Sequence, residues 1–132
     1  MNAEQKTVLC VEDNELELIA RKKLFEAAGF RVLEARSKES AISAFQSNPI
    51  DAVVLDYWLV TGLGGNGTAV AEAIKSIRPS TPVLMLSGYG PLPGESAIVD
   101  AWISKGGTDP VDLIRKVERL IEQRRRPETH KG

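Results

Sequence analysis

Residues 7–13 read TVLCVED, a short strand-like run that ends in two carboxylates. Its first five residues are apolar or nearly so and do not alternate with polar ones, which is typical of a strand covered on both faces of a sheet. Asn14 then stands where a helix cap is expected, with Glu17 in capping-box position. The stretch predicts a buried strand that leads directly into a helix, with the two carboxylates at the junction.

The same strand-then-helix pattern recurs along the chain. Further strands are expected over residues 31–35, 52–55, 82–86 and 101–104, and further helices after Ser37, from Thr68 to Ile77 and after Thr108 or Asp109. Residues at helical spacing are expected to face the core: Leu16, Ile19, Ala20, Leu24 and Ala27 in the first helix, and Val70, Ala73, Ile74 and Ile77 in the third. Alternating strands and helices predict an α/β fold, a doubly wound parallel sheet with helices on both faces.

Composition places the chain among soluble single domains. Its 132 residues suit one domain, with a core over about 7–121 and a polar tail over 122–132. The net charge of −1 argues against a broad nucleic-acid footprint, and a single cysteine fits a reducing compartment. Neither a signal-peptide pattern nor an apolar run long enough to span a bilayer is present in the sequence. We expect a cytoplasmic domain without a membrane partner.

Polar residues whose side chains could take part in a reaction stand at the ends of four expected strands. Glu12 and Asp13 follow the first, Asp56 ends the third, Ser87 the fourth, and Lys105 follows the fifth. Ligands of open parallel sheets bind outside the carboxyl ends of the strands, where these side chains would converge. Three neighbouring carboxylates repel one another, and a hard divalent cation relieves that repulsion. The pattern predicts a Mg²⁺ (or Mn²⁺) site beside a carboxylate that can attack phosphorus.

Four motifs at successive strand ends carry a family resemblance: VLCVEDN, VVLDYWL, PVLMLSG and AWISKG. With them the chain resembles the receiver (CheY-like) domain of bacterial two-component response regulators, from Val8 to about Ile121. The resemblance implies a flavodoxin-like five-stranded sheet of order 2-1-3-4-5. It also implies a shortened or irregular fourth helix, because the segment before Ala101 leaves room for only a turn or two around residues 95–99.

The resemblance also implies which residues bind the metal and the phosphoryl group. Asp56 would be the phosphoryl-accepting nucleophile and a metal ligand. Asp13 would bind Mg²⁺ directly and Glu12 through water, and the backbone carbonyl of Trp58 would be a further ligand. Lys105 would pair with the phosphoryl charge.

The resemblance further implies a switch. The Ser87 hydroxyl would be drawn toward the phosphoryl group, and Trp102 would be the aromatic side chain that moves with it, although Trp102 is almost as well explained as a core residue. Trp58 and Tyr89 match positions that line the route of the hydrolytic water, so two aromatics there predict slow dephosphorylation. Surface packing of both aromatics explains them about equally well.

The glycines at positions 62, 64 and 67 form a literal G-x-G-x-x-G. A dinucleotide fingerprint should follow its strand directly and have an acid at the end of the next strand. Here five residues separate Asp56 from the first glycine, and the next strand end reads PVLMLSG, without an acid. We therefore interpret the segment as a turn that leads into a helix.

The function expected from these residues is a phosphorylation-dependent signalling switch. A sensor histidine kinase or phosphotransfer protein would be the donor, and a downstream protein would be the target. The chain would catalyse only its own phosphorylation and dephosphorylation, either alone or as a piece of a longer regulator. Two alternatives remain: a pseudo-receiver that binds proteins without phosphorylation, and a flavodoxin-like cofactor protein. The acidic EDNE at residues 12–15 disfavours the second, because it would repel a flavin phosphate.

Overall fold

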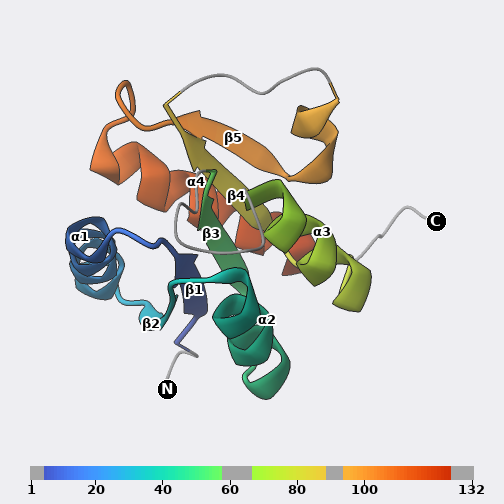
Figure 1. Cartoon of the computed structure of the whole chain (residues 1–132). Helices are drawn as coiled ribbons and strands as arrows, with labels where there is room; N and C mark the ends of the chain where they lie inside the picture. Colours follow the sequence, from blue (N-terminus) through green and yellow to red (C-terminus); the bar gives the residue numbers. More distant parts are fainter. Residues whose placement is uncertain (1–4, 58–66, 89–93, 126–132) are drawn as a thin grey trace.

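The computed structural model describes residues 5–57, 67–88 and 94–125. Within them five parallel strands form one sheet in the order β2-β1-β3-β4-β5, as predicted (Figure 1). The strands are β1 (Thr7–Val11), β2 (Arg31–Ala35), β3 (Ala52–Asp56), β4 (Val83–Ser87) and β5 (Ala101–Ser104). The helices are α1 (Glu15–Ala27), α2 (Lys38–Ser47), α3 (Gly67–Ile77), the 3₁₀ helix η1 (Glu95–Ile98) and α4 (Pro110–Arg125).

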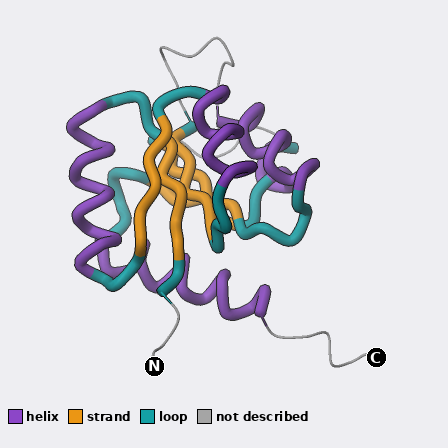
Figure 2. The backbone as a smooth tube through the Cα atoms, turned by 90° about the horizontal axis from the view of Figure 1, so that it is seen from below, coloured by secondary structure: helices purple, strands orange, loops and turns teal. Residues whose placement is uncertain are grey.

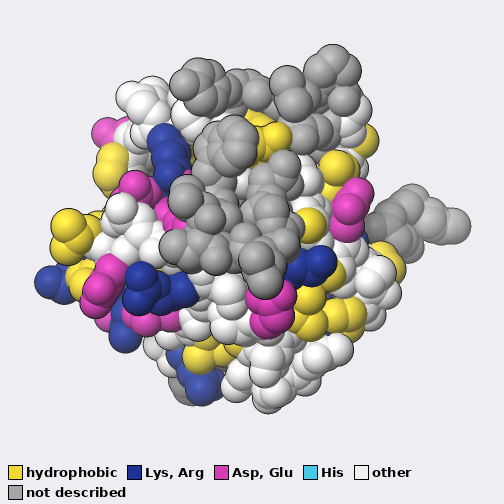
Figure 3. Space-filling view, in the orientation of Figure 1, with side chains coloured by type: hydrophobic (Ala, Val, Ile, Leu, Met, Phe, Trp, Pro, Cys, Tyr) yellow, Lys and Arg dark blue, Asp and Glu magenta, His cyan; other side chains and the backbone are white. Residues whose placement is uncertain are grey.

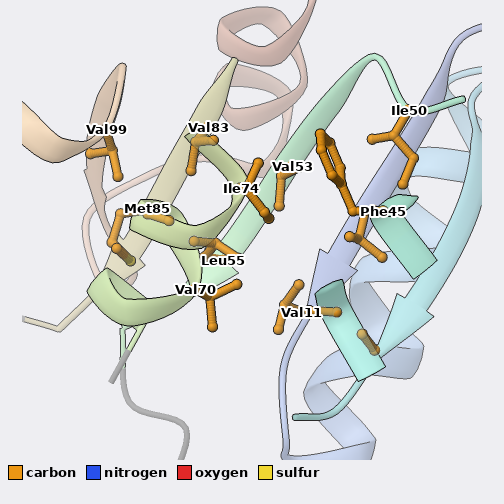
Figure 4. Close-up of a cluster of buried hydrophobic side chains, with 14 of the residues drawn as sticks. Val11, Phe45, Ile50, Val53, Leu55, Val70, Ile74, Val83, Met85 and Val99 are labelled. Carbon is orange, nitrogen blue, oxygen red and sulfur yellow. The ribbon is translucent and has the colours of Figure 1, made fainter. Parts of the chain in front are cut away.

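Helices cover both faces of the sheet, so its central strands are buried on both sides (Figure 2). On one face α2 and α3 pack over alternate strand residues, with Phe45 and Ile74 among the buried side chains (Figure 4). On the other face α1 and α4 pack through residues that include Phe25 and Val117. Every residue of β1, β3 and β4 is buried, which explains why their sequences lack polar alternation.

The cap of α1 differs from the predicted capping box. The Asn14 side chain accepts from the Glu17 amide at 3.0 Å, as expected. The reciprocal bond is replaced, because the Asn14 amide donates instead to Glu12 Oε2 at 3.1 Å. The Glu17 carboxylate instead accepts a hydrogen bond from Lys105.

The predicted inward face of α1 was wrong. Leu18 and Phe25 are the buried residues of this helix, whereas Leu16 is 78% and Ile19 41% exposed. The phase is set by tertiary contacts: the Phe25 ring packs edge-on against Phe30, with ring centroids 5.5 Å apart. Ala20 and Ala27 are also exposed, and Leu24 is half-buried. In α3 the predicted Val70 and Ile74 are buried, Ala73 is half-buried and Ile77 is exposed at the helix end, while Ala71 is buried although it was not predicted to be.

Element boundaries differ from the predicted ones by small amounts. Asp56 and Ser87 are the last residues of β3 and β4, as predicted, one residue beyond the apolar runs at 52–55 and 82–86. At the other end of the chain α4 continues to Arg125, although a polar tail was expected from residue 122. Arg124 explains the extension, because its guanidinium donates to the Asp51 carbonyl and carboxylate, both at 3.0 Å.

The expectation of a short, irregular helix before β5 is confirmed for the described residues. Between β4 and β5 they contain a single 3₁₀ helix of four residues, η1, followed by an extended Val99. Among the described helices none combines the length and the apolar character needed to cross a bilayer.

Candidate functional site

Three carboxylates meet at the carboxyl edge of the sheet. Glu12 and Asp13 follow β1 directly, and Asp56 ends the neighbouring β3. The parallel register that pairs Val11 with Leu55 brings Glu12 alongside Asp56. One oxygen from each carboxylate lies within 4.8 Å of the other two. The structure therefore assembles the predicted acidic cluster, with two members buried and Asp13 half-buried.

Burial makes these charges costly. Desolvation raises the pKa of Glu12, the negative charge of Asp56 raises it further, and the Asn14 amide and Arg21 counteract this only in part. Desolvation likewise raises the pKa of Asp56, although its hydrogen bond with Lys105 opposes the shift. A set of oxygen ligands with repelling, partly desolvated charges suits a hard divalent cation such as Mg²⁺. Glu12, Asp13 and Asp56 are the described residues that would hold it.

Lys105 brings an ammonium group to the same cluster. Its amide donates to the Ser87 carbonyl at 2.8 Å, which fixes the residue at the end of β5. Its Nζ forms a salt bridge with Asp56 Oδ1 and lies 3.7 Å from Glu12 Oε1. Burial alone would lower the pKa of Lys105, but the hydrogen bonds with Asp56 and Glu17 outweigh it and raise that pKa.

Two residues that the sequence reading did not place in the site join it from α1. Glu17 Oε1 accepts from Lys105 Nζ at 2.9 Å, and this bond lowers the pKa of Glu17. Arg21 Nη1 lies 3.1 Å from the buried Glu12 Oε1. The i,i+4 spacing of Glu17 and Arg21 was the available signal, since it places both on one helix face. Figure 3 shows acidic and basic side chains lying side by side over α1, on the left of the view.

The predicted switch residues lie on adjacent strands. Ser87 is buried at the end of β4, level with Ser104 of β5 in the register. Trp102 is half-buried on β5, and its ring packs against Tyr57 with centroids 5.5 Å apart. Trp58 and Tyr89, together with the predicted roles of both, lie outside the described residues.

Gly67 is the described member of the glycine motif and confirms a helix entry at that point. It is the first residue of α3, and its amide donates to the Tyr57 carbonyl at 2.6 Å. The glycine lies so close to β3 that a Cβ atom would come within 2.5 Å of the Asp56 carbonyl oxygen. This contact ties α3 to the strand that carries Asp56.

The raised carboxyl pKa values predict how stability depends on pH and metal. Because the pKa values of Glu12 and Asp56 are raised in the folded protein, the stability that they contribute below the ordinary carboxyl pKa is lost as pH rises through the raised values. The metal-free melting temperature should therefore fall between about pH 5 and about pH 8. Mg²⁺ should raise it more at the higher pH, where it displaces fewer protons.

Thermal unfolding in EDTA and in Mg²⁺ at both pH values measures this, with NaCl at equal ionic strength as the control. An equal Mg²⁺ effect at the two pH values, or no effect at either, would contradict the assignment of these carboxylates as ligands.

Comparison with known proteins places the chain in a family. The model of the response regulator receiver domain matches residues 8–117. A putative NtrX-like response regulator of Rickettsia typhi is 36% identical over 119 residues, covering 89% of this chain and 24% of the relative. The autoinducer 1 sensor kinase/phosphatase LuxN of Vibrio campbellii is 30% identical over 67% of this chain and 10% of its own length. The chain thus spans a tenth to a quarter of these two relatives.

A solved structure agrees with the fold. The CheY-like response regulator receiver domain protein from Methanospirillum hungatei superposes with a TM-score of 0.81 at 24% identity. The match covers 92% of this chain and 97% of that one, so the likeness of fold extends over nearly all of both.

Proposed function

Because this chain belongs to the response regulator receiver domain family, we propose that it is a signalling switch that accepts a phosphoryl group on Asp56. One observation carries the proposal: the Asp56 carboxylate lies close to both the Glu12–Asp13 pair and the Lys105 ammonium, so that candidate metal ligands and a cation meet at one carboxylate. This is the arrangement that phosphoryl transfer to a carboxylate requires.

The proposed reaction forms an acyl phosphate. An Asp56 carboxylate oxygen attacks phosphorus of a phosphohistidine, the P–N bond breaks, and the imidazole leaves with the electron pair and takes a proton. In the second half of the cycle water attacks phosphorus and the P–O bond to Asp56 breaks. Inorganic phosphate departs, and the Asp56 carboxylate is regenerated. In both steps the residues of this domain position the reacting groups and stabilise their charge.

Each site residue has a proposed role. Asp13 and Asp56 would hold Mg²⁺ (or Mn²⁺) directly and Glu12 through water, with the Trp58 carbonyl as a further ligand. Bound there, the ion would neutralise charge on the phosphoryl oxygens. Lys105 would pair with the same oxygens, since its ammonium already lies against Asp56.

The structural response to phosphorylation is proposed to pass through β4, which carries Ser87, and β5, which carries Trp102. The Ser87 hydroxyl would turn toward the phosphoryl group, and Trp102 would follow it. Contact between the Trp102 and Tyr57 rings supports this, because Tyr57 directly follows the phosphoacceptor. Side chains of Trp58 and Tyr89 would slow the approach of the hydrolytic water and prolong the phosphorylated state.

The partners are proposed to be proteins in the cytoplasm. A histidine kinase or a phosphotransfer protein would donate the phosphoryl group, and a downstream protein would recognise the phosphorylated form. On α1, directly after the acidic pair, Leu16 and Ile19 expose apolar surface beside the site. Exposed apolar residues one turn apart suit contact with a helix of the donor. Neither nucleic acid nor membrane is proposed as a ligand.

Phosphoryl uptake tests this function. Purified protein is incubated with acetyl phosphate, with and without Mg²⁺, and the phosphorylated fraction is measured by intact-mass spectrometry. Uptake should require Mg²⁺ and should be lost in Asp56→Asn, because the amide is a poor nucleophile. Transfer from a phosphohistidine donor provides a second assay for the case in which the small donor is inert. Failure with both donors, together with no Mg²⁺ binding, would favour a pseudo-receiver.

A further inference from the structure

The Lys105 ammonium is shared among carboxylates from three parts of the chain. It binds Asp56 at the end of β3 and Glu17 on α1 at 2.9 Å, and it lies 3.7 Å from Glu12. An ammonium group has three protons to donate, so three carboxylates can occupy all of them. Asp56 and Glu12 belong to the acidic cluster. Glu17 is an additional negative charge, and its shortest contact with the site is the bond to Lys105.

Glu17 weakens the attraction between the Lys105 ammonium and a phosphoryl group. A phosphoryl group on Asp56 would bring new anionic oxygens to an ammonium that Glu17 already holds. The carboxylate of Glu17 also repels those oxygens, and the Lys105 side chain is only 31% exposed, so water screens the repulsion incompletely. Glu17 therefore competes with the phosphoryl group for one cation.

Glu17 also has a second cation within reach. Arg21 Nη2 lies 3.8 Å from Glu17 Oε1, one helical turn further along α1, while Arg21 Nη1 binds Glu12 more closely at 3.1 Å. When Lys105 turns toward phosphoryl oxygens, Glu17 can close on Arg21 without becoming unpaired. The exchange costs no buried charge, because the Glu17 side chain is 45% exposed.

We propose that Glu17 is a positioning residue that shares Lys105 with Asp56 and thereby limits the affinity of the site for the phosphoryl group. The inference rests on the proposed function, since it concerns the same site. It predicts effects of opposite sign on two ligands. Removing the Glu17 charge should free Lys105 for an anion, but it should also make the surroundings of the metal more positive.

Isothermal titration calorimetry of the whole chain can separate the two effects. In Glu17→Gln, beryllofluoride, a phosphoryl analogue, should bind about threefold to tenfold more tightly at saturating Mg²⁺. Mg²⁺ alone should bind about twofold to threefold more weakly. A residue that only supported the local structure would weaken both when replaced. Far-UV circular dichroism checks that the variant is folded.

Glu15→Gln is the matched control, because it removes the same charge from the same helical turn at an exposed position. It should leave both affinities within about twofold of wild type. If Glu17→Gln behaves like Glu15→Gln, or weakens both ligands, the inference is overturned, while Asp56-dependent beryllofluoride binding by wild type still supports the proposed function. If wild type neither binds beryllofluoride nor takes up phosphoryl groups, both proposals are wrong.

Discussion

Replacement of Arg21 by methionine is expected to lower the free energy of unfolding by about 2–4 kcal/mol at neutral pH without Mg²⁺. The Arg21 guanidinium lies 3.1 Å from Glu12 Oε1, and the Glu12 side chain is only 2% exposed. Methionine keeps much of the apolar stem but leaves a desolvated carboxylate with Lys105, at 3.7 Å, as its nearest remaining cation. Equilibrium unfolding in urea measures the loss.

Lys22→Met is the matched control for this experiment. It removes the same charge from the next residue of α1, but the Lys22–Glu34 ion pair is about 40% exposed at both side chains, so the expected loss is below about 1 kcal/mol. Equal losses in the two variants would show that the buried Arg21–Glu12 pair contributes no more to the free energy of unfolding than an exposed ion pair.

The loss caused by Arg21→Met should depend on pH. The pKa of Glu12 is already raised by burial, and removal of Arg21 should raise it further. A carboxyl whose folded pKa is raised loses its stabilising contribution as pH rises through that pKa, so the difference from wild type should grow from acidic to neutral pH. Mg²⁺ should recover more stability in the variant than in wild type, because it supplies the missing positive charge.

Gly67→Ala is expected to lower the free energy of unfolding by about 2–3 kcal/mol and to reduce phosphoryl uptake. The new Cβ would come within 2.5 Å of the Asp56 carbonyl oxygen and 2.9 Å of Met85 Sδ. The sulfur can shift, but the carbonyl belongs to a buried strand, so α3 or the end of β3 must move. Alanine's better helix propensity, at most about 1 kcal/mol, offsets only part of this cost.

Gly106→Ala provides the comparison, because a Cβ there meets nothing within 4 Å and the backbone needs no left-handed conformation. Its stability should stay within about 0.5 kcal/mol of wild type. Urea unfolding and the uptake assay are run on both variants. A Gly67→Ala protein as stable and as active as Gly106→Ala would mean that α3 does not need this close approach.

The sequence by itself determined the strands, their end residues and the acidic cluster. Short apolar runs such as TVLCV and AVVL are typical of strands buried on both faces, and their alternation with helices indicates a parallel sheet, whose strands end at one edge. For that reason Glu12, Asp13 and Asp56 could be placed together without coordinates. The short irregular helix before β5 was also predictable, from the prolines and glycines ahead of it.

Only the tertiary structure decided which way α1 faces and what its charged residues bind. Its apolar residues fit more than one helical phase, and packing of Phe25 against Phe30 selects the phase that exposes Leu16 and Ile19. The same rotation turns Glu17 and Arg21 toward the acidic edge, where Lys105 arrives from a strand 88 residues away in sequence. Helical periodicity fixes which residues share a face, but the partners of that face are fixed only when distant parts of the chain pack against it.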